Sequence, residues 1–150
     1  LGATTPTYDL ESVPENPKPF DQLTHEMIHT ATVQFTGEIF QVPPAHSAIK
    51  VDGKRVYELA RAGKEVKLEP RKLIIYAFEI TRIDLPIVEF RVVCSTGTYI
   101  RSLAHDFGAA LGCGAHLSKL CRTRIGGFTL DKAESISSFE ERIKKLNTKV

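Results

Sequence analysis

Hydrophobic and polar residues alternate most clearly in the middle of the chain. Segment 71–83 reads RKLIIYAFEITRI, is rich in β-branched residues and predicts a strand. Segment 87–94 predicts a second strand, and the short loop 84–86 makes the two an antiparallel pair. Asp52-Gly53 predicts a turn that joins two further short extended runs.

Other segments have apolar residues at helical spacing. A helix that Thr24 caps and Gly37 ends is predicted by four residues on one face: Met27, Ile28, Ala31 and Phe35. A helix over 100–111 is predicted by five more: Ile100, Leu103, Ala104, Phe107 and Leu111. Segment 55–62 predicts a short helix, and segment 135–146 predicts a final polar helix with Ser135 as its cap. The expected class is therefore α+β, mainly antiparallel sheet with helices packed on it.

The composition restricts the class of protein but does not indicate a function. The chain has 42% hydrophobic and 25% charged residues, as a soluble globular protein has. It has no apolar run near the ~20 residues that cross a membrane, and three cysteines suit a reducing cytoplasm better than a disulfide framework. The net charge is only +2, so recognition of a nucleic acid depends on local basic clusters.

The stretch CSTGTYIRS places Tyr99 and Arg101 where a predicted strand leads into a helix. A cation in the first helical turn is disfavoured by the helix dipole unless an acidic group is nearby. Arg101 is therefore a candidate to orient a carboxylate or a phosphate, with Tyr99 packed on a base or sugar. The alternative is a surface arginine beside a half-buried tyrosine.

Two basic clusters suit an RNA backbone. Lys50, Lys54 and Arg55 follow a Pro-Pro pair and precede a tyrosine, and Lys119 and Arg122 form a second group. Basic residues interleaved with an aromatic residue are typical of single-stranded nucleic acid sites. Ordinary solvated loops remain the alternative for both clusters.

A metal site is a weaker possibility. Cys113, His116 and Cys121 have the spacing Cys-x2-His-x4-Cys, but no fourth ligand lies close in the sequence. A structural zinc site needs four ligands. Buried thiols and a hydrogen-bonded histidine explain these residues better, and no metal or cofactor is expected.

Five segments together resemble the bacterial tRNA pseudouridine synthases of the TruB type. Segment 1–9 (LGATTPTYD) is similar to the LG-x-x-T-x-T-x-D loop of that family, and segment 37–50 to its G-x-I-x-Q-x-P-x-x-SA-x-K motif. The resemblance continues through 53–63, 94–103 (CSTGTYIRSL) and 112–120 (GCGAHLSKL). It covers residues 1 to about 130 with little need for gaps.

The resemblance implies an isomerase that converts the T-loop uridine at tRNA position 55 to pseudouridine without metal or cofactor. Arg101 would hold the nucleophilic aspartate ionised and oriented, and Tyr99 and Leu120 would line the uracil pocket. The basic residues of both clusters would follow the backbone of the T-arm, from which the uridine is flipped out.

The sequence also departs from the family. The G-x-x-D-x-x-A-x-G segment with the catalytic aspartate is absent, and Asp9 matches a loop position rather than the nucleophile. We therefore expect residues 1–134 to be a partial catalytic domain, inactive alone. Residues 135–150 would form a helical tail without the RNA-binding extension of the family.

Three alternatives remain open. The chain could be a non-catalytic RNA-binding module on the same scaffold. It could come from a synthase of the same fold that acts on another RNA. It could also be a metal-stabilised interaction domain.

Overall fold

The computed structural model describes residues 1–44, 50–51, 54–55 and 68–147, and it divides into two compact units. The first unit is Leu1–Ser118 and the second is Lys119–Val150. The expected division after residue 134 stays a prediction.

The first unit is built on an antiparallel sheet of three strands in the order β1-β4-β5. The two predicted strands are confirmed as β4 (Arg71–Asp84) and β5 (Ile87–Cys94), which pair in antiparallel register. The third strand, β1 (Gly37–Gln41), pairs with the first residues of β4. It was not predicted, because the adjacent proline pair suggested irregular structure.

Strand β4 contains two irregularities that its sequence did not reveal. Between Ile75 and Ala77, and again between Ile80 and Arg82, one residue of β4 has no partner in the register with β5. Each extra residue changes which side chains face the core. Leu73 and Ile75 are buried, but Phe78 rather than Ala77 continues the buried face, and Tyr76 is 61% exposed.

The predicted turn at Asp52-Gly53 falls between two short strands, β2 (Lys50–Val51) and β3 (Lys54–Arg55). They pair in antiparallel register, which confirms the two extended runs. The helix expected over 55–62 lies outside the described residues beyond Arg55, and Arg55 itself ends β3.

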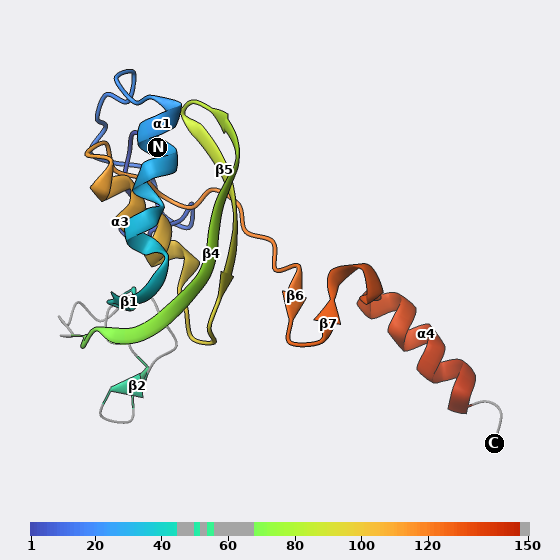
Figure 1. Ribbon diagram of the computed structural model, residues 1–150. Coiled ribbons are helices and arrows are strands. Elements are labelled where there is room, and N and C mark those ends of the chain that lie inside the picture. Colours follow the sequence, from blue (N-terminus) through green and yellow to red (C-terminus); the bar gives the residue numbers. More distant parts are fainter. Residues whose placement is uncertain (45–49, 52–53, 56–67, 148–150) are drawn as a thin grey trace. The chain divides into compact units, whose positions relative to one another are not determined.

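Two helices, α1 (His25–Ala31) and α3 (Ile100–Ala110), lie on the same side of the sheet (Figure 1). The side chain of Thr24 accepts a hydrogen bond from the Met27 N–H, which confirms the predicted cap. The expected apolar face of this helix is wrong at Met27, which is 45% exposed.

The helix is also shorter than predicted. It ends at Ala31 and is followed by the 3-10 turn η1 (Val33–Phe35), and Gly37 then adopts φ 93° to begin β1. Helix α3 follows its prediction closely, with Leu103, Ala104 and Phe107 buried and Gly112 at φ 78° after its end.

The core of the first unit lies between the sheet and these two helices. Ile28 of α1, Ile75 and Phe78 of β4, and Leu103 and Phe107 of α3 belong to one buried cluster. The rings of Phe78 and Phe107 lie 5.2 Å apart. This arrangement confirms the predicted α+β class with helices packed on an antiparallel sheet.

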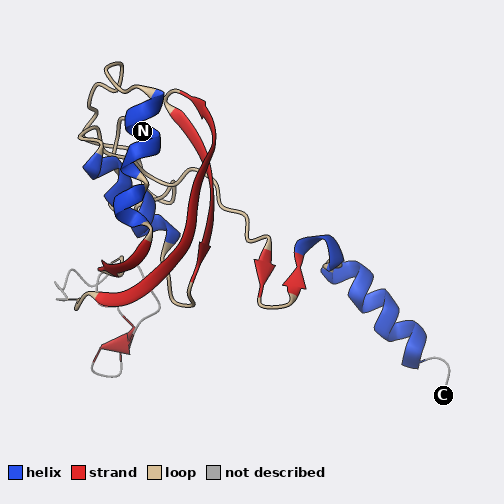
Figure 2. Ribbon diagram, in the orientation of Figure 1, coloured by secondary structure: helices blue, strands red, loops and turns tan. Residues whose placement is uncertain are grey.

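The second unit contains small elements that the sequence predicted only in part (Figure 2). Strands β6 (Arg124–Ile125) and β7 (Phe128–Thr129) form a hairpin around two glycines, and the 3-10 turn η2 (Leu130–Lys132) follows. Neither was predicted. The predicted last helix is confirmed as α4 (Ile136–Asn147), and the Ser135 hydroxyl accepts a hydrogen bond from the Ser138 N–H. Over the described residues, the helices are too short and too polar to cross a membrane.

Candidate functional site

Residues 95–99 form a turn between β5 and α3, so that Tyr99 ends the turn and Arg101 follows in the helix. The hydroxyl of Thr98 donates to the carbonyl of Ser95 at 2.8 Å, and Gly97 between them adopts φ 88°. Tyr99 is the N-cap of α3 and has extended backbone. Arg101 therefore lies in the first turn of the helix, as the sequence predicted.

Arg101 is held by an acidic group far away in the sequence. Its Nη1 lies 3.3 Å from Oδ2 of Asp9 and also donates to the Thr7 carbonyl at 3.5 Å. The side chains of Arg101 and Asp9 are only 23% and 19% exposed, so this ion pair is more protected from solvent than a surface salt bridge. The predicted need of Arg101 for an acidic partner is thus met by Asp9.

The carboxylate of Asp9 is fixed on its other oxygen as well. Oδ1 accepts hydrogen bonds from the Thr7 hydroxyl at 2.7 Å and from the Glu11 N–H at 3.0 Å. The hydroxyl of Thr5 donates to the Asp9 carbonyl at 2.7 Å. Both carboxylate oxygens of Asp9 are therefore engaged, one by Arg101 and the other by Thr7 and Glu11. The assignment of Asp9 to a loop position rather than to the nucleophile stays a prediction.

The loop with Asp9 is tied to the end of the first unit. The N–H of Leu117 donates to the Tyr8 carbonyl at 2.8 Å, and the N–H of Gly2 donates to the Gly114 carbonyl at 3.0 Å. Nδ1 of His116 lies 3.0 Å from the Ala3 carbonyl. The loop thus contacts two segments far away in the sequence: Arg101 at the start of α3, and residues 114–117.

Tyr8 and two residues of α3 form a group beside the ion pair. The Tyr8 ring stacks on His105 with centroids 3.9 Å apart, and Tyr8 adopts φ 65°. Burial raises the pKa of the Asp106 carboxyl, and nearby His105 opposes that rise. Burial also raises the pKa of Tyr8, as does the charge of Asp106. A positive φ at a tyrosine is uncommon and marks a backbone that its surroundings hold in place.

The other predicted residues are distributed over the chain. Leu120, Lys119 and Arg122 belong to the second unit, where all three are exposed. Lys50 lies in β2 and Lys54 in β3, but their side chains lie outside the described part, as does that of Arg55. Their assignment to the uracil pocket and to RNA binding stays a prediction.

The three residues of the possible metal site have other surroundings. Cys113 is buried and its thiol donates to the Gly114 carbonyl at 3.3 Å, while Cys121 is exposed in the second unit. His116 contacts the Ala3 carbonyl through Nδ1. Within the described residues there is no group of three or more side chains that could hold a metal ion.

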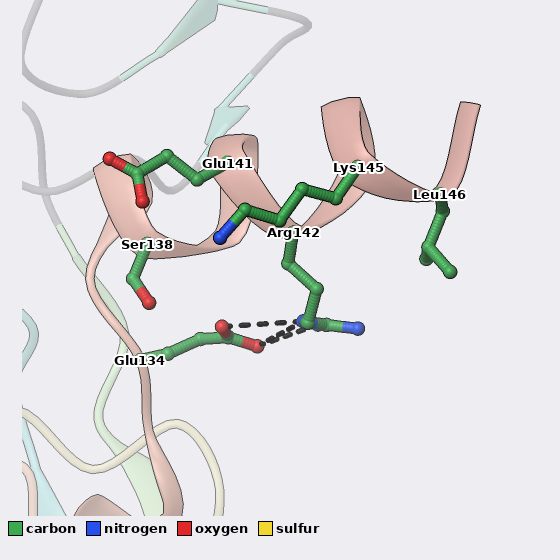
Figure 3. A pocket seen from close by; sticks show the side chains of 6 residues that line it. All are labelled: Glu134, Ser138, Glu141, Arg142, Lys145 and Leu146. Atoms are coloured by element: carbon green, nitrogen blue, oxygen red, sulfur yellow. Dashed lines mark hydrogen bonds and ion pairs between the residues drawn. The ribbon is translucent and has the colours of Figure 1, made fainter. Parts of the chain in front are cut away.

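A hollow in the second unit is lined by residues at and beside α4 (Figure 3). Nη2 of Arg142 contacts Oε1 of Glu134 at 2.6 Å, and the guanidinium lies 5.0 Å from the centre of the Phe139 ring. The contact with Glu134 raises the pKa of Arg142. The hollow contains none of the predicted site residues, and we assign it no function.

Comparison with solved structures defines the class of the fold. The chain matches a chain in the crystal structure of a Cbf5–Nop10–Gar1 complex with a TM-score of 0.58 and 39% sequence identity. The match covers 74% of this chain and 29% of that chain. The two proteins therefore share a catalytic fold.

Comparison with family models then gives the family. Residues 1–100 match the model for the N-terminal domain of TruB family pseudouridylate synthases, and residues 101–148 match that for the C-terminal domain of tRNA pseudouridylate synthase B. The chain belongs to the TruB family of pseudouridylate synthases, which confirms the resemblance found in the sequence.

Curated relatives agree with the family models. The chain is 53% identical over 143 residues to tRNA pseudouridine synthase B of Flavobacterium johnsoniae, covering 95% of this chain and 62% of that protein. It is 47% identical over 150 residues to the protein of the same name from Bacteroides fragilis, covering 100% and 64%. The chain thus spans less than two thirds of the length of these relatives.

Proposed function

We propose that this chain is part of a bacterial tRNA pseudouridine synthase that converts the T-loop uridine at position 55 of tRNA to pseudouridine. The observation that carries the proposal is the ion pair of Arg101 with Asp9 at the start of α3. Family membership and the names of the relatives support tRNA as the substrate.

The ion pair supports the start of α3 as the place where the chemistry would occur. An arginine guanidinium has five donors in a rigid fork, so it can contact more than one carboxylate. We infer that Arg101, already oriented by Asp9, holds the nucleophilic aspartate, which an upstream segment of the full-length protein supplies. Tyr99, two residues before Arg101, would pack against the uracil ring.

The reaction needs a flipped uridine and an ionised aspartate. The aspartate would attack or assist at the uridine, the glycosidic bond would break, and the base would rotate. A new bond would form between C5 and the ribose carbon and release the aspartate. The proton on C5 would then leave, and N1 would take up a proton. Arg101 would keep the carboxylate ionised through its positive charge, since an opposite charge nearby favours the charged form. Leu120 would close the pocket, and no cofactor takes part.

The basic residues would bind the RNA backbone. In this proposal Lys50, Lys54 and Arg55 form one contact region and Lys119 and Arg122 another. Lysine and arginine side chains that neutralise phosphates supply most of the sequence-independent affinity for nucleic acids. The T-arm stem-loop would be the ligand, and the protein would act in the cytoplasm.

The test is an isomerisation assay on T-arm RNA with tritium at C5 of the target uridine. We expect the full-length gene product to release tritium, since C5 loses its hydrogen when the C–C bond forms. We expect no release by the 150-residue chain. In the full-length protein, Arg101→Lys should lower kcat at least about 100-fold, because a point charge does not replace the planar fork of arginine.

Several results would contradict the proposal. Turnover by the 150-residue chain would show that the nucleophile lies within it. Binding of T-arm RNA without turnover by the full-length protein would favour a non-catalytic RNA-binding module. Turnover on other structured RNAs but not on the T-arm would favour a synthase of the same fold with another substrate.

A further inference from the structure

We propose that Gln41 is a positioning residue of the candidate site, because its buried side chain fixes the backbone from which Tyr99 and Arg101 project. The proposal rests on the proposed function, since it assumes that these two residues act on the uridine. It concerns a residue that contacts the protein backbone and not the substrate.

Both ends of the Gln41 amide bind one residue on another element. Gln41 is the last residue of β1 and is 2% exposed. Its Nε2 donates to the Tyr99 carbonyl at 3.0 Å, and its Oε1 accepts from the Tyr99 N–H at 2.8 Å. A buried amide with both groups satisfied is held in a single orientation, so it can in turn fix Tyr99.

The start of α3 needs this support because it has no cap of its own. The first N–H groups of a helix have no partner inside the helix, and the side chain of Tyr99 makes no capping hydrogen bond. The Tyr99 carbonyl also accepts the Leu103 N–H at 3.0 Å. Gln41 instead binds the N–H and the carbonyl of the N-cap residue itself, and its bond to that N–H is the one that a Glu or Gln makes in a capping box. The support therefore acts on Tyr99 and not on the N–H groups of the first helical turn.

A third hydrogen bond joins the same two segments. The Ser102 hydroxyl donates to the Val42 carbonyl at 3.1 Å, and Ser102 is 1% exposed. Arg101 thus lies between Tyr99 and Ser102, which are both bound by the end of β1. Asp9 holds its guanidinium from a third segment. The backbone and the side-chain tip of Arg101 are fixed independently.

This geometry predicts an effect on the chemical step. If the Gln41 contacts are lost, the first turn of α3 can shift while the RNA-binding residues keep their places. A misplacement of about 1 Å at a catalytic group can cost about 100-fold in rate. Loss of Gln41 should therefore lower kcat and leave KM for RNA nearly unchanged.

The experiment compares Gln41→Met with wild type in the full-length protein. Methionine has nearly the same volume but makes neither hydrogen bond. We expect kcat on T-arm RNA to fall about 10- to 100-fold, with KM changed less than about threefold.

Hydrogen exchange should become faster at the Tyr99 amide but not at the Ser95 amide, which binds the Ile74 carbonyl in the sheet at 2.8 Å. Gln22→Met is the matched control, because Gln22 is exposed and its Nε2 donates to the carbonyl of Pro19, three residues before it.

Each outcome decides the proposal. A kcat within about twofold of wild type, or equally faster exchange at Ser95 and Tyr99, would show that Gln41 contributes only to the overall stability of the fold and would contradict the proposal. If Gln41→Met does not fold, Ser102→Ala replaces it, with a smaller fall in kcat expected and the same criteria. A wild-type enzyme without isomerase activity would overturn the proposed function itself, whereas an active wild type with an unaffected variant overturns only the role of Gln41.

Discussion

At the scale of single residues, the site depends on hydrogen bonds that hold one carboxylate. The Thr7 hydroxyl has one proton, which it donates to Oδ1 of Asp9, so the Ser12 hydroxyl 2.6 Å away must donate to Thr7. The Thr7 N–H in turn donates to Ser12 at 3.1 Å. Thr7 is buried, and this chain of hydrogen bonds gives Asp9 one orientation toward Arg101.

Replacing Thr7 tests this chain of hydrogen bonds. We expect Thr7→Val to lower the free energy of unfolding by about 1–3 kcal/mol, because a partly buried carboxylate oxygen loses a donor and Ser12 loses an acceptor. Thr7→Ser keeps the hydroxyl and should cost less than about 1 kcal/mol. Urea denaturation of both variants measures the difference, and equal losses for valine and serine would show that the methyl group matters more than the hydrogen bond.

At the scale of elements, α3 is placed by close contact with the segment that follows it. A Cβ atom on Gly108 would lie 2.3 Å from the Cβ and the backbone nitrogen of Ala115. The Gly108 carbonyl also accepts the Gly114 N–H at 2.9 Å. The helix can approach residues 114 and 115 only because position 108 has no side chain. This contact brings α3 and its Arg101 toward the segment to which the Asp9 loop is bound.

Gly108→Ala should therefore destabilise the protein although alanine is the better helix former. The intrinsic preference for alanine is about 1 kcal/mol, but the contacts with backbone atoms cannot be relieved by a rotamer change. We expect a net loss of about 1–3 kcal/mol, measured by thermal or urea unfolding. Gly127→Ala is the control, since a Cβ there has no atom within 4 Å, and it should be nearly neutral. A Gly108→Ala variant as stable as wild type would mean that the helix can move away.

At the scale of the whole molecule, charge bears on RNA binding only through its local distribution. The net charge is +2, with 20 basic and 18 acidic residues. Such a balance gives little long-range attraction for RNA. Some of the basic residues form exposed ion pairs on the sheet, such as Arg91 with Glu79 at 2.9 Å, and the acidic partner offsets their charge. In the proposed function, RNA binding would then depend on a few cations outside such pairs.

The salt dependence of RNA binding tests this view in the full-length protein. Lys119→Gln together with Arg122→Gln should reduce the slope of log K against log salt by about 1.5, because each phosphate contact contributes about 0.7 to 0.9. Filter binding of T-arm RNA at several salt concentrations gives the slope. Lys18→Gln with Lys132→Gln is a control pair outside the predicted RNA-binding residues. An equal change in slope for both pairs would show that Lys119 and Arg122 make no specific contribution.

The sequence by itself determined the elements that local physics controls. The β-branched alternation of β4 and β5, the apolar spacing of α3, and the caps at Thr24 and Ser135 predicted these elements correctly, since hydrophobic periodicity and capping act over a few residues. It also singled out Arg101 as a candidate to orient a carboxylate or a phosphate. The motifs around Arg101 indicated the resemblance to the family.

Only the tertiary structure decided which distant residues meet. Asp9 and Arg101 are separated by 92 positions and Gln41 and Tyr99 by 58, and no local pattern couples such pairs. The bulges in β4 and the pairing of β1 were likewise missed, because strand register depends on partners elsewhere in the chain. The sequence could mark Arg101 as a candidate site residue. Only the packing of loop, strand and helix showed that Asp9 binds its side chain and that Gln41 binds the neighbouring Tyr99.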